Sequence, residues 1–251
     1  MDKRYKAIIA YDGSSFIGWQ RQIEGLSVQS AIEEVLSAMH KRPVKVTASG
    51  RTDKGVNALA QVIHFDSDLK LDIKTYLRAL NAQMHEAIIF KHLEIVDHQF
   101  HARKDAKYKI YQYRIGIGEV DIFKRHQVFY TQKKLDVERL KEAAQVFVGT
   151  HDFSSFNTNS KEEMPNQVRT IYKVDVTQEE DEIRITFVGS GFMRYMVRMM
   201  TQTLMEVANH KLTIDDLARI LEAKDKTLVS YLAKPQGLTL LEVGYVDYQN
   251  N

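Results

Sequence analysis

The order of two kinds of hydrophobic periodicity along the chain is the feature that most restricts its fold. Alternation of apolar and polar residues predicts strands, whereas apolar residues spaced three to four apart predict helices. Ser27 and Asp72 are placed as N-cap residues of two helices. In the first half the pattern predicts strand, helix, strand, strand, helix, strand, over residues 5–11, 28–40, 44–48, 61–65, 72–83 and 87–96.

The same order returns in the second half if one extra helix is set aside. Strands are expected at 108–117, 168–176, 183–188 and 238–246, and helices at 140–148, after Asp136, at 191–208, and from Thr213 to about Glu222. Thr213 and Asp216 form a capping box. The chain is therefore predicted to be α/β, of the α+β type. We expect two ferredoxin-like βαββαβ units with mainly antiparallel sheets, helices on one face and a central active-site cleft. The predicted domains are 1–105 and 106–251.

Composition excludes several classes of protein. With 44% hydrophobic residues, 27% charged residues and only 3 Pro, the 251 residues suit one large or two small globular domains. The absence of Cys excludes disulfides, thiolate metal sites and a cysteine nucleophile. No apolar stretch has the length of a signal peptide or membrane span, so we expect a cytoplasmic protein without membrane contact.

Charge is unevenly distributed, although the formal net charge is only +2. The chain up to Arg114 has 18 basic and 13 acidic residues, and the remainder has 17 and 20. The first half is therefore the better candidate for contact with an anionic partner.

A long polar loop at residues 48–58 separates two predicted strands. Gly50 and Gly55 permit close backbone approach, and Arg51 and Asp53 place opposite charges two residues apart. One interpretation is a solvated loop with an incidental ion pair. The other makes Asp53 a catalytic carboxylate held beside an arginine.

Residues 100–114 interleave six basic or histidine side chains with four aromatic ones. Such a strand can bind phosphate with one set of side chains and stack bases on the other. Lys109, Tyr111 and Tyr113 share one face of the predicted strand. A half-buried tyrosine strand with a solvated lysine side fits the pattern equally well.

Five of the nine Met residues lie between Met193 and Met205, and four of them, Met193, Met196, Met199 and Met200, share one broad face of a predicted helix. This methionine face is typical of a core. Arg194 and Arg198 lie together on the other side, where they either face solvent or present a guanidinium to an anion. The four His between His85 and His101 match no zinc pattern, and no dinucleotide-binding, P-loop or serine-nucleophile motif is present.

Several segments together resemble the tRNA pseudouridine synthase A family, in the family's order and over nearly the whole chain. Gly50-Arg51-Thr52-Asp53 followed by Gly-Val is the most specific of them. The others are residues 11–20, 100–103, 149–153, 169–171, 191–198 and 233–238, together with Tyr111.

The resemblance implies an isomerase that detaches uracil from C1′ of a tRNA uridine and rejoins it through C5. It implies action at positions 38–40 of the anticodon arm, no metal or organic cofactor, and a homodimer that spans the tRNA. Asp53 matches the catalytic aspartate, which competing mechanisms describe as a nucleophile or a base. Arg198 matches its arginine partner, Tyr111 the tyrosine that packs on the base, and Arg51 the arginine that holds the flipped nucleotide. Arg103 and Lys54 are further expected substrate contacts.

The chain departs from the family pattern at Lys54, Asn57, Lys104-Asp105 and residues 199–202, where the family commonly has other residues. These departures put substrate detail in doubt and leave a second hypothesis, a catalytically silent tRNA-binding or folding paralogue. Lys54 itself is either an added phosphate contact or a solvated side chain. A ferredoxin-like enzyme for a small molecule is a third hypothesis, and its binding would depend little on salt.

Overall fold

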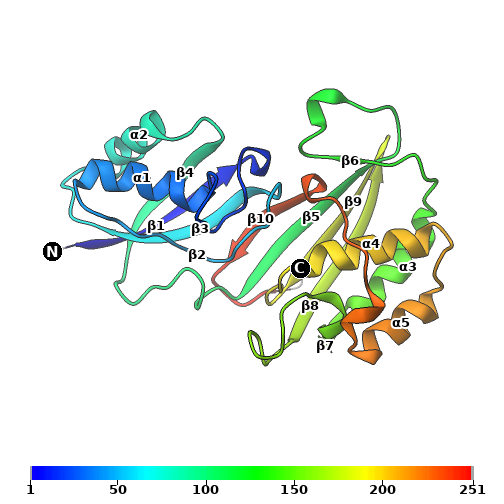
Figure 1. The fold of residues 1–251 in the computed structure, drawn as a ribbon. Coiled ribbons are helices and arrows are strands. Elements are labelled where there is room, and N and C mark those ends of the chain that lie inside the picture. Colours follow the sequence, from blue (N-terminus) through cyan, green and yellow to red (C-terminus); the bar gives the residue numbers. More distant parts are fainter. Residues whose placement is uncertain (1, 250–251) are drawn as a thin grey trace. The chain divides into compact units, whose positions relative to one another are not determined.

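In the computed structural model, which describes residues 2–249, the chain divides into two units (Figure 1). The first contains the residues up to Ala106 and, from the end of the chain, Leu240–Val246. The second contains Lys107–Thr239 and the residues from Asp247 onward. Residues 240–246 were expected in the second domain. The structure instead assigns them to the first unit, together with the N-terminal part of the chain.

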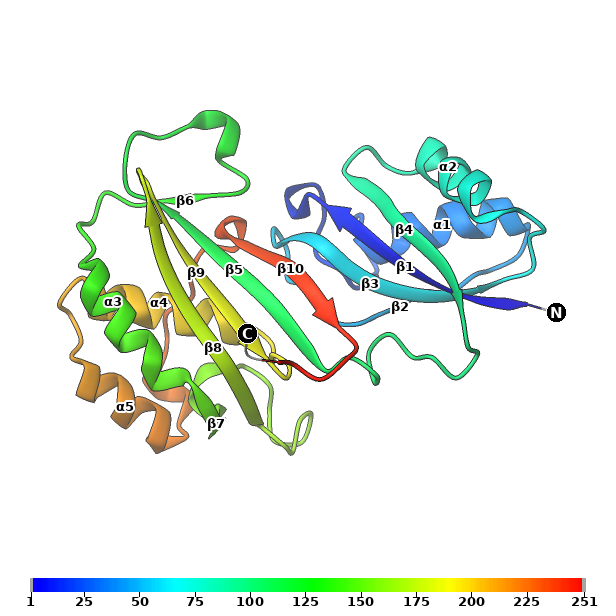
Figure 2. The ribbon, with the colours of Figure 1, turned by 180° about the vertical axis from the view of Figure 1, so that it is seen from behind.

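The sheet of the first unit is built from β1 (Lys3–Tyr11), β2 (Thr47–Ala48), β3 (Asn57–Ser67) and β4 (Ile88–Val96). Its order is β4-β1-β3, and β3 pairs in addition with the short β2 and with β10 (Leu238–Gly244). The pairs β1–β3, β1–β4 and β2–β3 are antiparallel. Helices α1 (Val28–His40) and α2 (Ile73–Gln83) lie behind the strands in Figure 2.

Alternation along β1 builds the core of this unit. Tyr5, Ala7, Ile9 and Tyr11 are buried, whereas the residues between them are part-exposed. The Tyr5 ring meets the edge of Tyr76 from α2 at a centroid distance of 5.4 Å. Burial of this apolar face is what holds the helices on the sheet.

Both helices of the first unit begin where their caps predict. The Ser27 hydroxyl accepts from the Ser30 backbone N–H in a capping box, and Asp72 accepts from the Thr75 N–H. Each interaction satisfies a donor that the first helical turn leaves unpaired.

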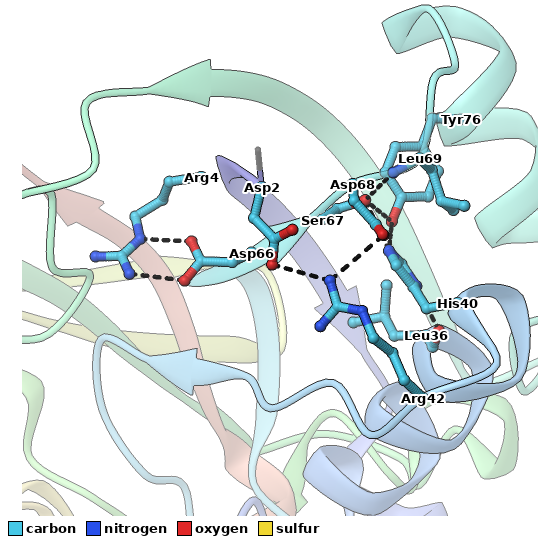
Figure 3. A network of polar contacts seen from close by, with 10 residues as sticks. All are labelled: Asp2, Arg4, Leu36, His40, Arg42, Asp66, Ser67, Asp68, Leu69 and Tyr76. Carbon is cyan, nitrogen blue, oxygen red and sulfur yellow. Dashed lines mark hydrogen bonds and ion pairs between the residues drawn. The ribbon is translucent and has the colours of Figure 1, made fainter.

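Polar contacts fix the end of β3 to the end of α1 (Figure 3). His40 Nε2 lies 2.7 Å from the Ser67 hydroxyl, and its Nδ1 lies 2.6 Å from the Leu36 carbonyl oxygen. Arg42 pairs with Asp2 and Asp68 nearby. Exposed pairs of this kind contribute little individually, so the partly buried histidine is the firmer connection.

The second unit has a sheet of order β5-β9-β8-β7, antiparallel throughout, from β5 (Tyr108–Gly116), β7 (Gly149–Asp152), β8 (Val168–Glu179) and β9 (Glu182–Gly189). The short β6 (Phe129–Tyr130) pairs with β5 in parallel. The helices are α3 (Val137–Ala144), α4 (Met196–Ala208) and α5 (Ile214–Ala223). In Figure 2, β8 and β9 lie in front of α4. The methionine-rich α4 is buried along most of its length, as the sequence predicted.

The predicted α/β class with mainly antiparallel pairing is confirmed, but three local expectations are wrong. The helix expected from residue 191 begins at Met196, because Tyr195 has a left-handed backbone with φ 64°. The strand expected at 44–48 is only Thr47–Ala48, and the sequence pattern missed β6 and β7. Strands this short contain too few residues to show alternation.

Candidate functional site

Asp53 lies in the loop that joins β2 to β3 in the first unit. Its neighbour Thr52 is buried, and the Thr52 hydroxyl lies 2.8 Å from the phenol oxygen of Tyr11, at the end of β1. The Trp19 backbone N–H donates to the Thr52 carbonyl over 3.0 Å. The loop is therefore tied to both ends of the 11–19 segment and is not freely solvated.

Two glycines let the chain approach this loop closely. A Cβ at Gly13 would lie 2.1 Å from the Val56 carbonyl oxygen, and one at Gly18 would lie 3.1 Å from the Thr52 carbonyl oxygen. Gly18 also has φ +120°, which favours glycine. The two sequence segments that carried most of the family resemblance thus pack directly on one another.

Buried amide and hydroxyl groups complete the support of the loop. Ser49 donates to the Gln61 side chain over 2.7 Å, and Gln61 donates to the Gly50 carbonyl over 2.9 Å. Asn57 accepts from the Gly13 N–H over 2.9 Å. Asn57, a departure from the family pattern, therefore has a structural function here. The sequence alone could not predict this network. The glycines of the loop stand out, but its small polar residues look like those of any solvated loop.

The predicted site residues of this loop differ in exposure. Asp53 is half-buried, whereas Arg51 and Lys54 are exposed. The loop thus presents a partly shielded carboxylate between two cationic side chains that are accessible to a large anion.

Arg103, also in the first unit, is exposed at the end of a tightly held turn. The buried His64 accepts from the Ala102 N–H over 3.1 Å, and Tyr245 donates to the Ala102 carbonyl over 2.7 Å. Burial, reinforced by the positive charges of Arg4 and His101, lowers the pKa of His64 to about 4. A neutral His64 is what this acceptor role requires.

Tyr111 lies on β5 in the second unit and is 7% exposed. Its ring meets the ring of Phe192 edge to face at a centroid distance of 5.2 Å. A tyrosine held in one orientation by a second aromatic ring provides a defined surface for a planar partner.

Arg198 lies on α4 in the second unit and is 8% exposed. Its Nε donates to the Ala233 carbonyl oxygen over 2.7 Å, and its guanidinium carbon lies 5.2 Å from the centre of the Tyr195 ring. The backbone contact fixes one edge of the guanidinium, and the ring supports its face. The sequence did not indicate a role for Tyr195, because a tyrosine gives no signal for the left-handed backbone that it adopts here.

Among residues 2–249, no group of three or more His, Asp or Glu side chains is placed to hold a metal ion. Within that range no helix combines the length and apolar character needed to cross a membrane.

Comparison with known proteins identifies the family. The family model described as tRNA pseudouridine synthase matches residues 7–105 and 143–246. The chain belongs to the tRNA pseudouridine synthase family. The prediction of an isomerase of this family is thereby confirmed.

Individual members are similar over almost their entire length. A tRNA pseudouridine synthase A of an Exiguobacterium species is 44% identical over 97% of this chain and 98% of its own. Proteins of the same name from a Geobacillus species and Listeria monocytogenes are each 42% identical, over 98% and 96% of this chain and 99% of their own. A chain from the crystal structure of a Cbf5-Nop10-Gar1 complex aligns over 95% of this chain and 58% of its own, with 11% identity and a TM-score of 0.34. That structural likeness is too weak to support an argument.

Proposed function

We propose that this member of the family converts uridine to pseudouridine at positions 38–40 in the anticodon stem-loop of tRNA. The observation that supports this most strongly is the match to relatives named tRNA pseudouridine synthase A, at up to 44% identity over nearly full length. The proposal also includes a homodimer acting on the anticodon arm in the cytoplasm.

The chemistry requires no group beyond the substrate and the protein. The bond from N1 to C1′ breaks, a bond from C5 to C1′ forms, C5 loses its proton and N1 gains one. Atoms and oxidation state are conserved, so the proposal includes no metal and no organic cofactor.

Asp53 is the proposed catalytic carboxylate. Breaking the glycosidic bond leaves C1′ electron-deficient, and an ionised carboxylate captures or stabilises such a centre. In this proposal Arg198 is its cationic partner and keeps it ionised. The support for Asp53 is a loop fixed by Tyr11 and Trp19, because catalytic groups need a held geometry.

The remaining roles follow from the need to take the base out of the stack. A uridine inside a stem exposes neither C1′ nor C5 to a side chain, so the base must flip. Tyr111, held against Phe192, packs on the flipped base, and Arg51 keeps the nucleotide out. The exposed Lys54 and Arg103 are proposed phosphate contacts.

An Asp53→Asn variant tests the central role. With an anticodon stem-loop transcript labelled with tritium at C5 of uridine, wild type should release the label to water, because C5 loses its proton. Asp53→Asn should release it at least a thousandfold more slowly, on the order of the loss when a nucleophile or base is removed.

The matched control is Asp215→Asn, at an exposed aspartate of the first turn of α5, which should retain wild-type activity. Full activity in Asp53→Asn would contradict the role of Asp53. Tight tRNA binding without label release by wild type would instead favour the silent tRNA-binding paralogue.

A further inference from the structure

Arg169, the second residue of β8, is a half-buried cation held by neutral groups. Its Nη1 donates to the carbonyl oxygens of Asn166 over 3.1 Å and Val168 over 2.6 Å. Its Nη2 lies 3.2 Å from the Met164 sulfur. Burial lowers the pKa of Arg169, with no carboxylate opposing that shift. Arg169 begins one of the segments that resemble the family, residues 169–171, but it has no role in the proposed chemistry.

Two other part-buried arginines of the same unit are compensated by a carboxylate, whereas Arg139 donates to the carbonyl oxygens of Val207 and Leu212. Arg114 and Arg184 both pair with Glu182, at 2.6 and 2.7 Å. Among residues 2–249, no carboxylate lies within ion-pair distance of Arg169. A cation removed from water is costly unless an anion meets it, so Arg169 is prepared for an anionic ligand.

The geometry leaves one edge of the guanidinium available. Both hydrogens of Nη1 are committed to carbonyls, and one hydrogen of Nη2 points to sulfur. Gly191 lies on the Nε side, where a Cβ would stand in van der Waals contact with Nε, at 3.9 Å. Glycine therefore leaves open the Nε–Nη2 edge, which binds phosphate or carboxylate through two parallel hydrogen bonds.

The position of this edge suggests which anion it binds. Gly191 directly precedes Phe192, whose ring packs on Tyr111, and consecutive Cα atoms are only about 3.8 Å apart. We propose that Arg169 and Gly191 form a phosphate site for the backbone of the substrate tRNA, beside the nucleotide that packs on Tyr111. The identity of the RNA rests on the proposed function, whereas the phosphate chemistry rests on Arg169.

Binding measured against salt tests the site. The dissociation constant of an unmodified tRNA transcript is measured for wild type and Arg169→Gln at increasing KCl. Arg169→Gln should bind about tenfold more weakly at low salt. The slope of log K against log salt should fall by about 0.7–0.9, the loss of one phosphate contact. The control Arg219→Gln removes an exposed arginine that pairs with Asp216, and it should leave both values unchanged.

Two further variants separate ligand binding from folding. Arg169→Lys retains the charge but loses the two-pronged geometry, so its affinity should lie between those of wild type and Arg169→Gln. Gly191→Ala should weaken binding without changing net charge, because its methyl group narrows the approach to Nε. If these variants bind tRNA as tightly as wild type with the same salt slope, the site is disproved, even if their melting temperatures fall.

The outcomes distinguish this inference from the proposed function. A changed slope in Arg169→Gln with no label release by wild type would support the phosphate site and contradict the activity. Label release by wild type with an unchanged salt slope in Arg169→Gln would support the activity and contradict the phosphate site.

Discussion

At the scale of single residues, histidine shows how burial changes protonation. His64 accepts a hydrogen bond from the Ala102 N–H, and it can do so only through an unprotonated nitrogen. Its folded pKa of about 4 lies below the unfolded value of 6.5. Between these two values the unfolded chain binds the extra proton, so stability rises with pH across this window.

We therefore expect His64 to make the protein acid-sensitive. As pH falls from 6.5 to about 4, its contribution should be lost progressively, by about 2–3 kcal/mol in total. Urea unfolding of wild type and His64→Asn at pH 7.5 and 4.5 checks this. The asparagine still accepts a hydrogen bond but does not titrate, so its stability should fall less. An equal fall in both proteins would contradict the assignment.

Residue identity alone gave an incomplete account of Asn57. As a departure from a family pattern it suggested altered chemistry, whereas the structure gives it the Gly13 N–H as a donor. A substituted residue in a site segment can thus support the backbone without touching substrate. No sequence pattern could separate the two roles, because the partner lies 44 residues away.

At the scale of elements, the turn after β1 and the start of β3 share one close approach. A Cβ on Gly13 would meet the Val56 backbone at 2.1 Å, a distance that only movement of the main chain can relieve. Gly13→Ala should therefore destabilise the protein by about 1–3 kcal/mol. It should also slow label release, because the displaced backbone continues into the Asp53 loop.

Chemical denaturation and the tritium assay measure these two effects of Gly13→Ala. Its control is Ser14→Ala at the exposed neighbouring position, which should behave as wild type in both. Unchanged stability and activity in Gly13→Ala would show that the close approach has no consequence.

Element boundaries were predictable where a local signal defines them. Ser27, Asp72 and Thr213 each cap the helix that the sequence assigned to them, because capping involves residues only three apart. The start of α4 was not predictable in this way. The part-exposed Tyr195 adopts its left-handed backbone with its ring against the Arg198 guanidinium, a contact that helix propensity does not describe.

At the scale of the whole molecule, periodicity predicted the strand near residue 240 but not its sheet. Leu240–Val246 belongs to the unit formed by the first 106 residues, although it follows the second unit in the chain. Hydrophobic periodicity predicts which residues of a strand are buried, but it does not predict which strand pairs with it. The candidate site residues were found through their motifs, whereas their supporting contacts join segments far apart in sequence.

Because residues 240–246 belong to the first unit, that unit depends on the last strand for its stability. Leu240 is fully buried, so Leu240→Ala should cost about 2–5 kcal/mol. The loss should appear in the first unit, as faster hydrogen exchange of amides in β1 and β3.

The matched variant Leu217→Ala removes an equally buried leucine of α5 in the second unit. Its faster exchange should appear in α3 and α4, while β1 and β3 keep wild-type protection. Hydrogen exchange followed by mass spectrometry on both full-length variants makes the comparison. If each variant accelerates exchange equally in both units, the chain opens as a single cooperative structure. In that case Leu240 would contribute no more to the first unit than to the second.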